Sequence, residues 1–347
     1  MSNKQNKERI VWIDWARSFC MFLVILGHCH INTQNSFITQ YIYSFHMMFF
    51  FFLSGLLCKS DLRLVTIKKD IRYIILPYFT YGIILIIFSI IRERSFNWET
   101  ISSQIISLFI GDDPSIGPIW FLPALFICKQ IFYFIKITKS YNSIIYFILV
   151  FLSFVPTCLI SKYNPNYPLF ADSALCGLPF FIIGNESYIL MGILRHIKLY
   201  FHLCLSGLLL YISIILCEFN GFVSLASCTT GQSIYAYFIN AFVAIMSISI
   251  FCMMLNEIRL SFITITSYGT IVTLGLHGIP LTILNYYLPI LLGFEVSSYP
   301  LYIAIIYSII TYYVCYICII ILDKWHYALF GLKGTLDTQN INSGWRI

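Results

Sequence analysis

The chain has 347 residues, of which 59% are hydrophobic and only 10% are charged. Soluble domains carry about a quarter charged residues, so this composition excludes a water-soluble globular protein and predicts a polytopic integral membrane protein. The net charge of +6 does not indicate a nucleic-acid partner, because the basic residues lie in short connections between apolar runs, as membrane topology requires. The twelve cysteines include one C-x-x-C spacing, Cys315 to Cys318 inside an apolar run, and no second one to pair with it, so we expect small buried side chains rather than a disulfide framework or a zinc site.

Ten apolar runs, separated by polar segments, predict an all-α transmembrane helix bundle of about ten spans. We expect a single domain over residues 1–347, with polar tails at 1–9 and 324–347. The first run is expected to be a retained span rather than a signal peptide, because it contains an arginine and no small-residue cleavage site follows it. The ninth run is expected to be broken near Gly275 to Pro280. The expected spans are 10–30, 41–58, 74–91, 118–135, 144–161, 171–193, 199–217, 233–255, 262–291 and 299–322.

The lysines and arginines are distributed unevenly between alternate connections. Sixteen of the 21 fall in one set of connections and three in the other. Because positive residues accumulate on the cytoplasmic side, this distribution predicts that both termini are cytoplasmic and that the number of spans is even. The segment from Lys59 to Arg72 is then the most basic cytoplasmic connection, and the connection from Arg92 to Gly117 is the longest external one.

The first span carries ionisable residues within the apolar stretch IDWARSFCMFLVILGHCH, Ile13 to His30. Arg17 and His28 are eleven residues apart, so they lie on one helix face, about 16 Å apart along the axis. Asp14 lies one turn before Arg17 and is expected to pair with it. His30 points about 200° away from His28, so the two are not expected to share a metal, and no metal site is predicted. His30 is interpreted as the interfacial end of the helix.

Two interpretations of this polar stripe stay open. Arg17 either snorkels to the cytoplasmic headgroups or contributes to a site, and His28 is either a packing residue or a functional one. Ionisable groups within a membrane span usually mark a pathway or a site, and two on one stripe strengthen that interpretation. A neutral imidazole at this place is suited to accept a proton from a hydroxyl as a general base.

Three later spans contain further candidates for the lining of a substrate path. His46 is expected near the outer side of the second span, and Ser54-Gly55 near its inner side, where small residues let a backbone or a ligand approach closely. Trp120 opens the fourth span at the outer face and is either a platform for a sugar ring or part of the interfacial aromatic belt. His277 lies where the ninth span is expected to break, and it either supports a site or packs.

In chain order, these segments resemble the acyltransferase-three family of integral membrane acyltransferases, which includes bacterial polysaccharide O-acetyltransferases. Arg17, ten residues and His28 resemble the family's R/K-x10-H motif, and FHMMFFFFLSGLL resembles its FH-x-x-x-F-F-x-x-S-G segment. The resemblance covers most of the chain. The other segments that are similar to the family are KKDIRYIILPYF (68–79), GPIWFLPALFICKQI (117–131), FFIIGN (180–185) and TSYGTIVTLGLHGIP (266–280).

The resemblance implies roles for residues of the first span. His28 falls on the family's essential histidine and Arg17 on its arginine, and we group Asp14 with them as a candidate catalytic residue. The family's cytoplasmic R-x-x-R motif handles acyl-CoA.

This chain departs from the R-x-x-R motif, because its nearest match is Lys69-Asp70-Ile71-Arg72. Lysine keeps the charge but loses the bidentate contact to phosphate. The resemblance implies acetyl-CoA as the acyl donor and co-substrate. We assign its binding to Lys68, Lys69 and Arg72, together with Arg17.

The leading hypothesis is a membrane O-acyltransferase, expected to transfer acetyl, with His28 as the general base or as a transient acyl carrier. It moves the acyl group from cytoplasmic acyl-CoA to a hydroxyl of an extracytoplasmic cell-surface saccharide. The implied location is the cytoplasmic membrane of a bacterium, surrounded by membrane lipids. A transporter or flippase of an anionic or lipid-linked substrate, with Arg17 and His28 as a relay, stays open as the alternative, although the chain lacks two related halves. A purely structural assembly factor leaves the polar stripe unexplained.

Overall fold

The computed structural model describes residues 10–29, 36–58, 64–93, 96–111, 114–163, 165, 167–292, 300–325 and 327–334, and over these ranges the chain is helical, without a named strand. Ten helical segments are long and apolar enough to cross a membrane, which confirms the predicted polytopic bundle. These segments are Val11–His28, Phe37–Leu56, Leu64–Glu93, Gly117–Tyr141, Ser143–Tyr163, Pro168–Glu186, Leu199–Asn220, Ile234–Met254, Thr270–Ile290 and Leu301–Lys324.

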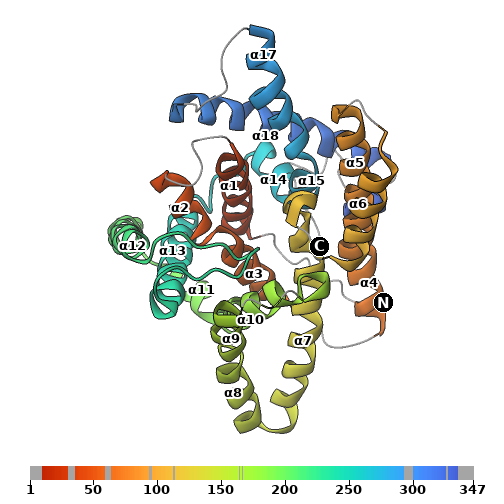
Figure 1. The fold of residues 1–347 in the computed structure, drawn as a ribbon. Helices are drawn as coiled ribbons and strands as arrows, with labels where there is room; N and C mark the ends of the chain where they lie inside the picture. The colour runs from red at the N-terminus through yellow and green to blue at the C-terminus, as the bar shows by residue number, and fades with distance from the viewer. Residues whose placement is uncertain are drawn as a thin grey trace, which may run out of the picture.

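Helix α1 (Val11–His28) lies among other helices rather than at the edge of the bundle (Figure 1). Two thirds of its span is buried inside the protein, which is why a helix with polar residues is tolerated in this apolar chain. The helices packed against it are α2 (Phe37–Tyr43), α3 (His46–Leu56), α13 (Ile234–Met254), α14 (Ser261–Tyr268), α15 (Thr270–Leu276), α16 (Gly278–Thr282) and α18 (Leu301–Lys324).

Helices α3 and α10 (Ala171–Glu186) approach each other backbone to backbone at two glycines. A Cβ atom on Gly55 would lie 1.9 Å from the Phe181 carbonyl oxygen, and one on Gly184 would lie 2.1 Å from the Phe52 carbonyl oxygen. Only glycine permits this separation. The close approach expected at Ser54-Gly55 is therefore made by another backbone.

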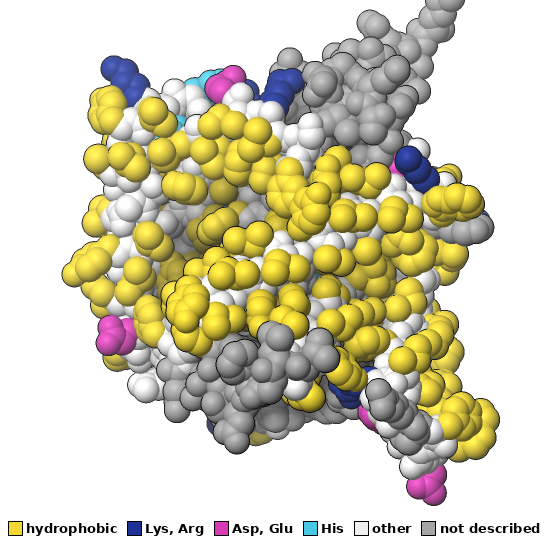
Figure 2. Space-filling view, turned by 90° about the horizontal axis from the view of Figure 1, so that it is seen from above, with side chains coloured by type: hydrophobic (Ala, Val, Ile, Leu, Met, Phe, Trp, Pro, Cys, Tyr) yellow, Lys and Arg dark blue, Asp and Glu magenta, His cyan; other side chains and the backbone are white. Residues whose placement is uncertain are grey.

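The periphery of the bundle is apolar. Helices α7 (Phe121–Tyr141), α8 (Ser143–Leu152) and α9 (Val155–Tyr163) extend together from the bundle, and α12 (Leu199–Asn220) lies beside α13 (Figure 1). Hydrophobic side chains cover most of the face that Figure 2 shows, with charged side chains toward its margins. In water such a surface would aggregate, whereas in a membrane it contacts lipid.

Two expected connections are helical in the structure, which corrects the sequence prediction. The third span begins at Leu64, ten residues earlier than expected, and runs through α4 (Leu64–Asp70), a π-helix (Ile71–Ile75) and α5 (Leu76–Glu93). No glycine or proline interrupts residues 64–76, and this lets the basic stretch continue the helix.

The second correction is α6 (Trp98–Ile110), which lies within the connection expected to be an external loop. The Asn97 side chain caps its first turn by accepting a hydrogen bond from the Glu99 N–H (2.9 Å), and Gly111 ends it with φ 67°. The helix is too short and too polar to stand out as a span, and its packing against α5 stabilises it instead.

Two spans are interrupted near histidines. Phe45, with φ −149° and ψ −25°, separates α2 from α3 immediately before His46. In the ninth span α15 ends at Leu276 and α16 begins at Gly278, but His277 between them keeps a helical backbone (φ −59°, ψ −26°), so the helix is interrupted at one residue and not unwound. Pro280 has no N–H to donate to the preceding turn, and this weakens the helix there. A π-helix (Ile283–Tyr287) and α17 (Leu288–Leu292) follow.

The remaining elements are short. Helix α11 (Tyr188–Leu194) follows α10, and a 3-10 turn, Tyr327–Phe330, packs against α5, where the Tyr81 hydroxyl donates to the Phe330 carbonyl (3.1 Å). Two further 3-10 turns, Pro114–Trp120 and Pro168–Phe170, precede α7 and α10.

Candidate active site

Three histidines from three spans converge at the carboxyl end of α1. The ring centroid of His28 lies 5.3 Å from that of His277 and 6.1 Å from that of Tyr43, and the Tyr43 ring lies 5.1 Å from that of His46. His46 and His277 are buried, with 3% and 1% of their surface exposed, whereas His28 is exposed. The sequence placed these histidines in separate spans, and the structure brings them together.

The hydrogen bonds of the two buried histidines determine their tautomers. The Nδ1–H of His46 donates to the Ile42 carbonyl (2.7 Å), and the Nδ1–H of His277 donates to the Thr273 carbonyl (2.8 Å). A carbonyl oxygen only accepts, so both neutral rings carry their proton on Nδ1 and leave Nε2 as an acceptor. Each of the two rings thus has one nitrogen committed to its own helix and one available to the cluster.

His28 differs from both neighbours, because within the described ranges its ring makes ring contacts but no hydrogen bond. The residues on either side of it, Gly27 and Cys29, are buried. An accessible imidazole without a fixed partner is free to take a hydrogen bond from a substrate, and this distinguishes His28 from a histidine that only packs.

At the opposite end of α1, polar groups are tied to α14 and α18. Asp14 is 7% exposed and accepts a hydrogen bond from the Ser267 hydroxyl (2.6 Å). The Ser18 hydroxyl lies 2.8 Å from that of Thr266 and 2.7 Å from that of Tyr312. These bonds join segments more than 240 residues apart in the chain.

Arg17 is half-buried, one turn after Asp14 on the stripe that leads toward His28. The stripe therefore has a charged, hydrogen-bonded end at Asp14 and Arg17, and an imidazole end at His28.

The basic stretch at the start of the third span divides into one buried acid and several exposed cations. Asp70 is 5% exposed and forms an ion pair with Lys129 of α7. Its second oxygen accepts hydrogen bonds from the Tyr133 hydroxyl (3.1 Å) and the Gln130 side chain (3.4 Å). The acid that departs from the R-x-x-R pattern thus anchors the stretch to α7.

Lys68, Lys69 and Arg72 are all exposed on this anchored stretch. The predicted donor-binding cations are therefore accessible from outside the bundle, on a helix whose orientation is set by Asp70. Exposed cations attract a polyanionic nucleotide through long-range and charge-assisted contacts.

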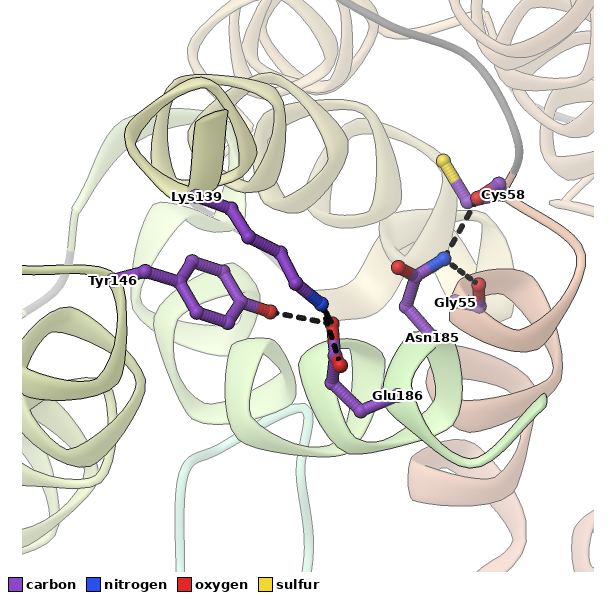
Figure 3. Close-up of polar contacts among 6 residues, drawn as sticks. All are labelled: Gly55, Cys58, Lys139, Tyr146, Asn185 and Glu186. Carbon is purple, nitrogen blue, oxygen red and sulfur yellow. Dashed lines mark hydrogen bonds and ion pairs between the residues drawn. The ribbon is translucent and has the colours of Figure 1, made fainter. Parts of the chain in front are cut away.

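The carboxyl end of α10 is a polar junction that sequence reasoning did not predict (Figure 3). The Asn185 side chain donates to the Gly55 carbonyl (2.9 Å) and the Cys58 carbonyl (2.7 Å), so it caps the end of α3. Glu186 accepts hydrogen bonds from Lys139 (2.8 Å) and the Tyr146 hydroxyl (2.6 Å), which connects α10 to the α7–α8 hairpin. The only signal in the sequence was the family-like FFIIGN segment that ends at Asn185.

The remaining site predictions fall in different environments. Trp120 is only 6% exposed and packs against Phe121 and Phe170, so it does not present a platform to a ligand at an open face. Ser54 is half-buried beside Gly55, and a role for either in a substrate path stays a prediction. His30 lies outside the described residues. Over the described part of the chain, no three His, Cys, Asp or Glu side chains are grouped as metal ligands.

A comparison with protein families identifies the family of the chain. A family model described as an acyltransferase domain matches residues 10–321, from the start of α1 to the last turn of α18. No curated protein and no solved structure matches the chain. The matched region contains the histidine cluster, the Asp14–Arg17 end of α1 and the basic stretch at the start of the third span.

Proposed function

The chain belongs to the acyltransferase-three family of integral membrane acyltransferases, and we propose that it is an O-acetyltransferase that uses acyl-CoA and acetylates a hydroxyl of a cell-surface saccharide. The observation that carries this proposal is His28, an accessible imidazole without a hydrogen bond in the described ranges, on the helix face that also carries Arg17. His46 and His277, by contrast, each have one ring nitrogen bonded to a carbonyl of their own helix.

In the proposed reaction His28 acts as the general base. A ring nitrogen of His28 accepts the proton of the saccharide hydroxyl, and the oxygen attacks the thioester carbonyl carbon. The C–S bond breaks, the acetyl group forms an ester with the saccharide, and the CoA thiolate takes up a proton. The transient imidazolium has an N–H to donate, and the Nε2 of His277 is the neighbouring acceptor that would stabilise it.

An acyl-histidine route uses the same residues in another order. His28 would first accept the acetyl group and then pass it to the saccharide hydroxyl. The two routes are separated by mixing the enzyme with labelled acetyl-CoA in the absence of an acceptor and quenching the reaction rapidly. Covalent label on the wild-type protein, and none on His28→Ala, supports the acyl-histidine route.

The donor is proposed to arrive at the opposite end of the bundle. Lys68, Lys69 and Arg72 supply exposed positive charge for the phosphates of CoA, and Arg17 lies between this end and His28 along α1. With both termini in the cytoplasm, as the distribution of lysine and arginine predicts, this end faces the cytoplasm and His28 faces outward. A bacterial cytoplasmic membrane is the location that fits this sidedness.

The test is acetyl transfer by the purified protein in lipid vesicles. Labelled acetyl-CoA and a panel of glycans are supplied, and CoA release and labelled glycan are measured for the wild type and for His28→Ala. We expect the wild-type protein to transfer acetyl to a glycan and His28→Ala to have lost this activity. Label transfer that is unaffected by His28→Ala would refute the assignment of the base, and glycan uptake without consumption of any acyl-CoA would favour a transporter instead.

A further inference from the structure

The connection between α12 and α13, residues 221–233, is a rigid hairpin rather than a loose loop. Ser224 and Thr229 form a two-way backbone bridge of 3.0 and 2.9 Å. Asn220 closes the base of the hairpin, because its side chain donates to the Thr230 carbonyl (2.8 Å) and accepts from the Ser233 N–H (2.8 Å). Hydrogen bonds at both the tip and the base therefore hold the backbone of this hairpin in place.

The hairpin buries one set of side chains and exposes another. Val223, Leu225 and Cys228 are at most 4% exposed, so they anchor the hairpin to the bundle. The side chain of Phe222, by contrast, is 45% exposed. The polar residues exposed on the same hairpin are Ser227, Thr229 and Gln232.

Phe222 is connected to His28 through Tyr43. The Phe222 and Tyr43 ring centroids are 5.7 Å apart at an interplanar angle of 34°, and the Tyr43 ring meets His28 edge to face at 6.1 Å. Gly27 leaves room for this tyrosine, because a Cβ atom there would lie 3.2 Å from the Tyr43 Cε2 atom. A continuous run of rings thus leads from an exposed aromatic side chain to the accessible imidazole.

We propose that Phe222 and Tyr43 form the acceptor subsite of the enzyme, where an uncharged sugar ring stacks on the Phe222 ring with one hydroxyl directed at His28. The proposal rests on the acetyltransferase function proposed above. A pyranose presents an apolar face of C–H groups that packs on an aromatic ring, and its hydroxyls pair with neutral polar groups such as those of Thr229 and Gln232.

The charge around the subsite selects against acidic sugars. Residues 221–233 contain no charged side chain, and neither does α2, Phe37–Tyr43. The nearest charge along the chain is Glu218, an exposed carboxylate. These segments offer no cation to a uronic acid or a phosphorylated sugar, and the Glu218 carboxylate would repel either one. We therefore expect the subsite to favour a neutral sugar ring.

The experiment compares Phe222→Ala and Phe222→Trp with the wild type in vesicles. The probes are nitrophenyl glycosides of glucose, galactose and glucuronate, with acetyl-CoA as the donor. We expect Phe222→Ala to raise the KM for the neutral glycosides about ten-fold while the KM for acetyl-CoA stays unchanged, and Phe222→Trp to keep the wild-type acceptor KM. The glucuronide is expected to be the poorest acceptor.

Phe219→Ala is the matched control, because Phe219 is 61% exposed at the end of α12 and is not part of the run of rings. Binding of the glucoside is also followed by saturation-transfer NMR, which does not depend on turnover. An unchanged acceptor KM and an unchanged NMR signal in Phe222→Ala, or a preference for the glucuronide, would overturn the subsite while leaving the acetyltransferase function intact. Absence of acetyl transfer to every glycan by the wild-type protein would overturn both.

Discussion

The two ends of α1 carry polar groups in opposite states. At one end Asp14 is buried and receives a 2.6 Å hydrogen bond from Ser267, and Ser18 is enclosed by Thr266 and Tyr312. At the other end His28 is exposed and, over the described residues, has ring neighbours but no hydrogen bond. The same helix therefore has one end that holds the bundle together and one end whose polar group is available to a substrate.

Helix α3 also has two different ends, although its histidine, unlike His28, is buried and hydrogen-bonded. Its Gly55 end is packed against the backbone of α10 and capped by Asn185, whereas its His46 end belongs to the histidine cluster. We expect the groups with satisfied contacts to account for stability in both helices, and the accessible imidazole of His28 is the group that we propose for the chemistry. Variants at the two ends should therefore fail in different ways.

The largest expected effect is on activity at the imidazole end. His28→Ala should lower kcat for acetyl transfer by about 10²–10⁴-fold, the usual contribution of a general base, with little loss of stability because the ring makes no hydrogen bond in the described ranges. Turnover and thermal unfolding are measured on the same samples. The exposed His196→Ala is the control and should match the wild type. Loss of folding in His28→Ala would remove the distinction between the two ends.

The second effect is on stability, at the anchored basic stretch. Asp70→Ala leaves Lys129 without its carboxylate and should destabilise the protein by about 3–5 kcal/mol. The double variant Asp70→Leu/Lys129→Met should recover most of that loss, because it removes both charges. Unfolding in detergent measures both. Equal destabilisation in the single and double variants would show that the ion pair is not what holds this stretch.

The third effect concerns the packed end of α3. Gly55→Ala forces a methyl group against the Phe181 carbonyl and should cost roughly 1–3 kcal/mol or more, with kcat reduced only as far as folding is reduced. Gly207→Ala is the matched control, because a Cβ atom there meets nothing within 4 Å. A stable Gly55→Ala protein with lost activity would instead place Gly55 in the substrate path.

The smallest effect is on donor binding. Arg72→Ala should raise the KM for acetyl-CoA about ten-fold, a loss that grows smaller as salt is added, and should leave the acceptor KM unchanged. Lys198→Ala, which removes another exposed cation, controls for net charge. A donor KM that does not respond to Arg72→Ala would separate the basic stretch from CoA and leave it as a topology signal.

The sequence was sufficient for the bundle and for the position of His28, because apolar runs of about 20 residues and the spacing of Arg17 and His28 are local properties. The start of the third span was placed too late, since a helix that begins with lysines and an acid is stabilised by Lys129 and Tyr133, which lie about 60 residues away. Helix α6 was missed because it is too short and polar for a span.

The composition of the site depended on tertiary contacts. The sequence left Trp120 open between a platform for a sugar ring and a part of the interfacial aromatic belt, and the fold instead buries it against Phe121 and Phe170. Phe222 had no distinguishing motif, and the role that we propose for it rests on the contact of its ring with Tyr43 beside His28, which only the fold reveals. The convergence of His28 and His277, 249 residues apart along the chain, likewise required the fold.

The most direct test of the account is a sidedness assay in sealed vesicles. Labelled acetyl-CoA is enclosed in the lumen, a neutral glycan is supplied outside, and vesicles are sorted by the accessibility of a C-terminal tag. We predict labelled external glycan only from vesicles whose C-terminus faces the lumen, and none from His28→Ala. Transfer only when donor and glycan share one side would contradict a path along α1 from the Arg17 end to His28.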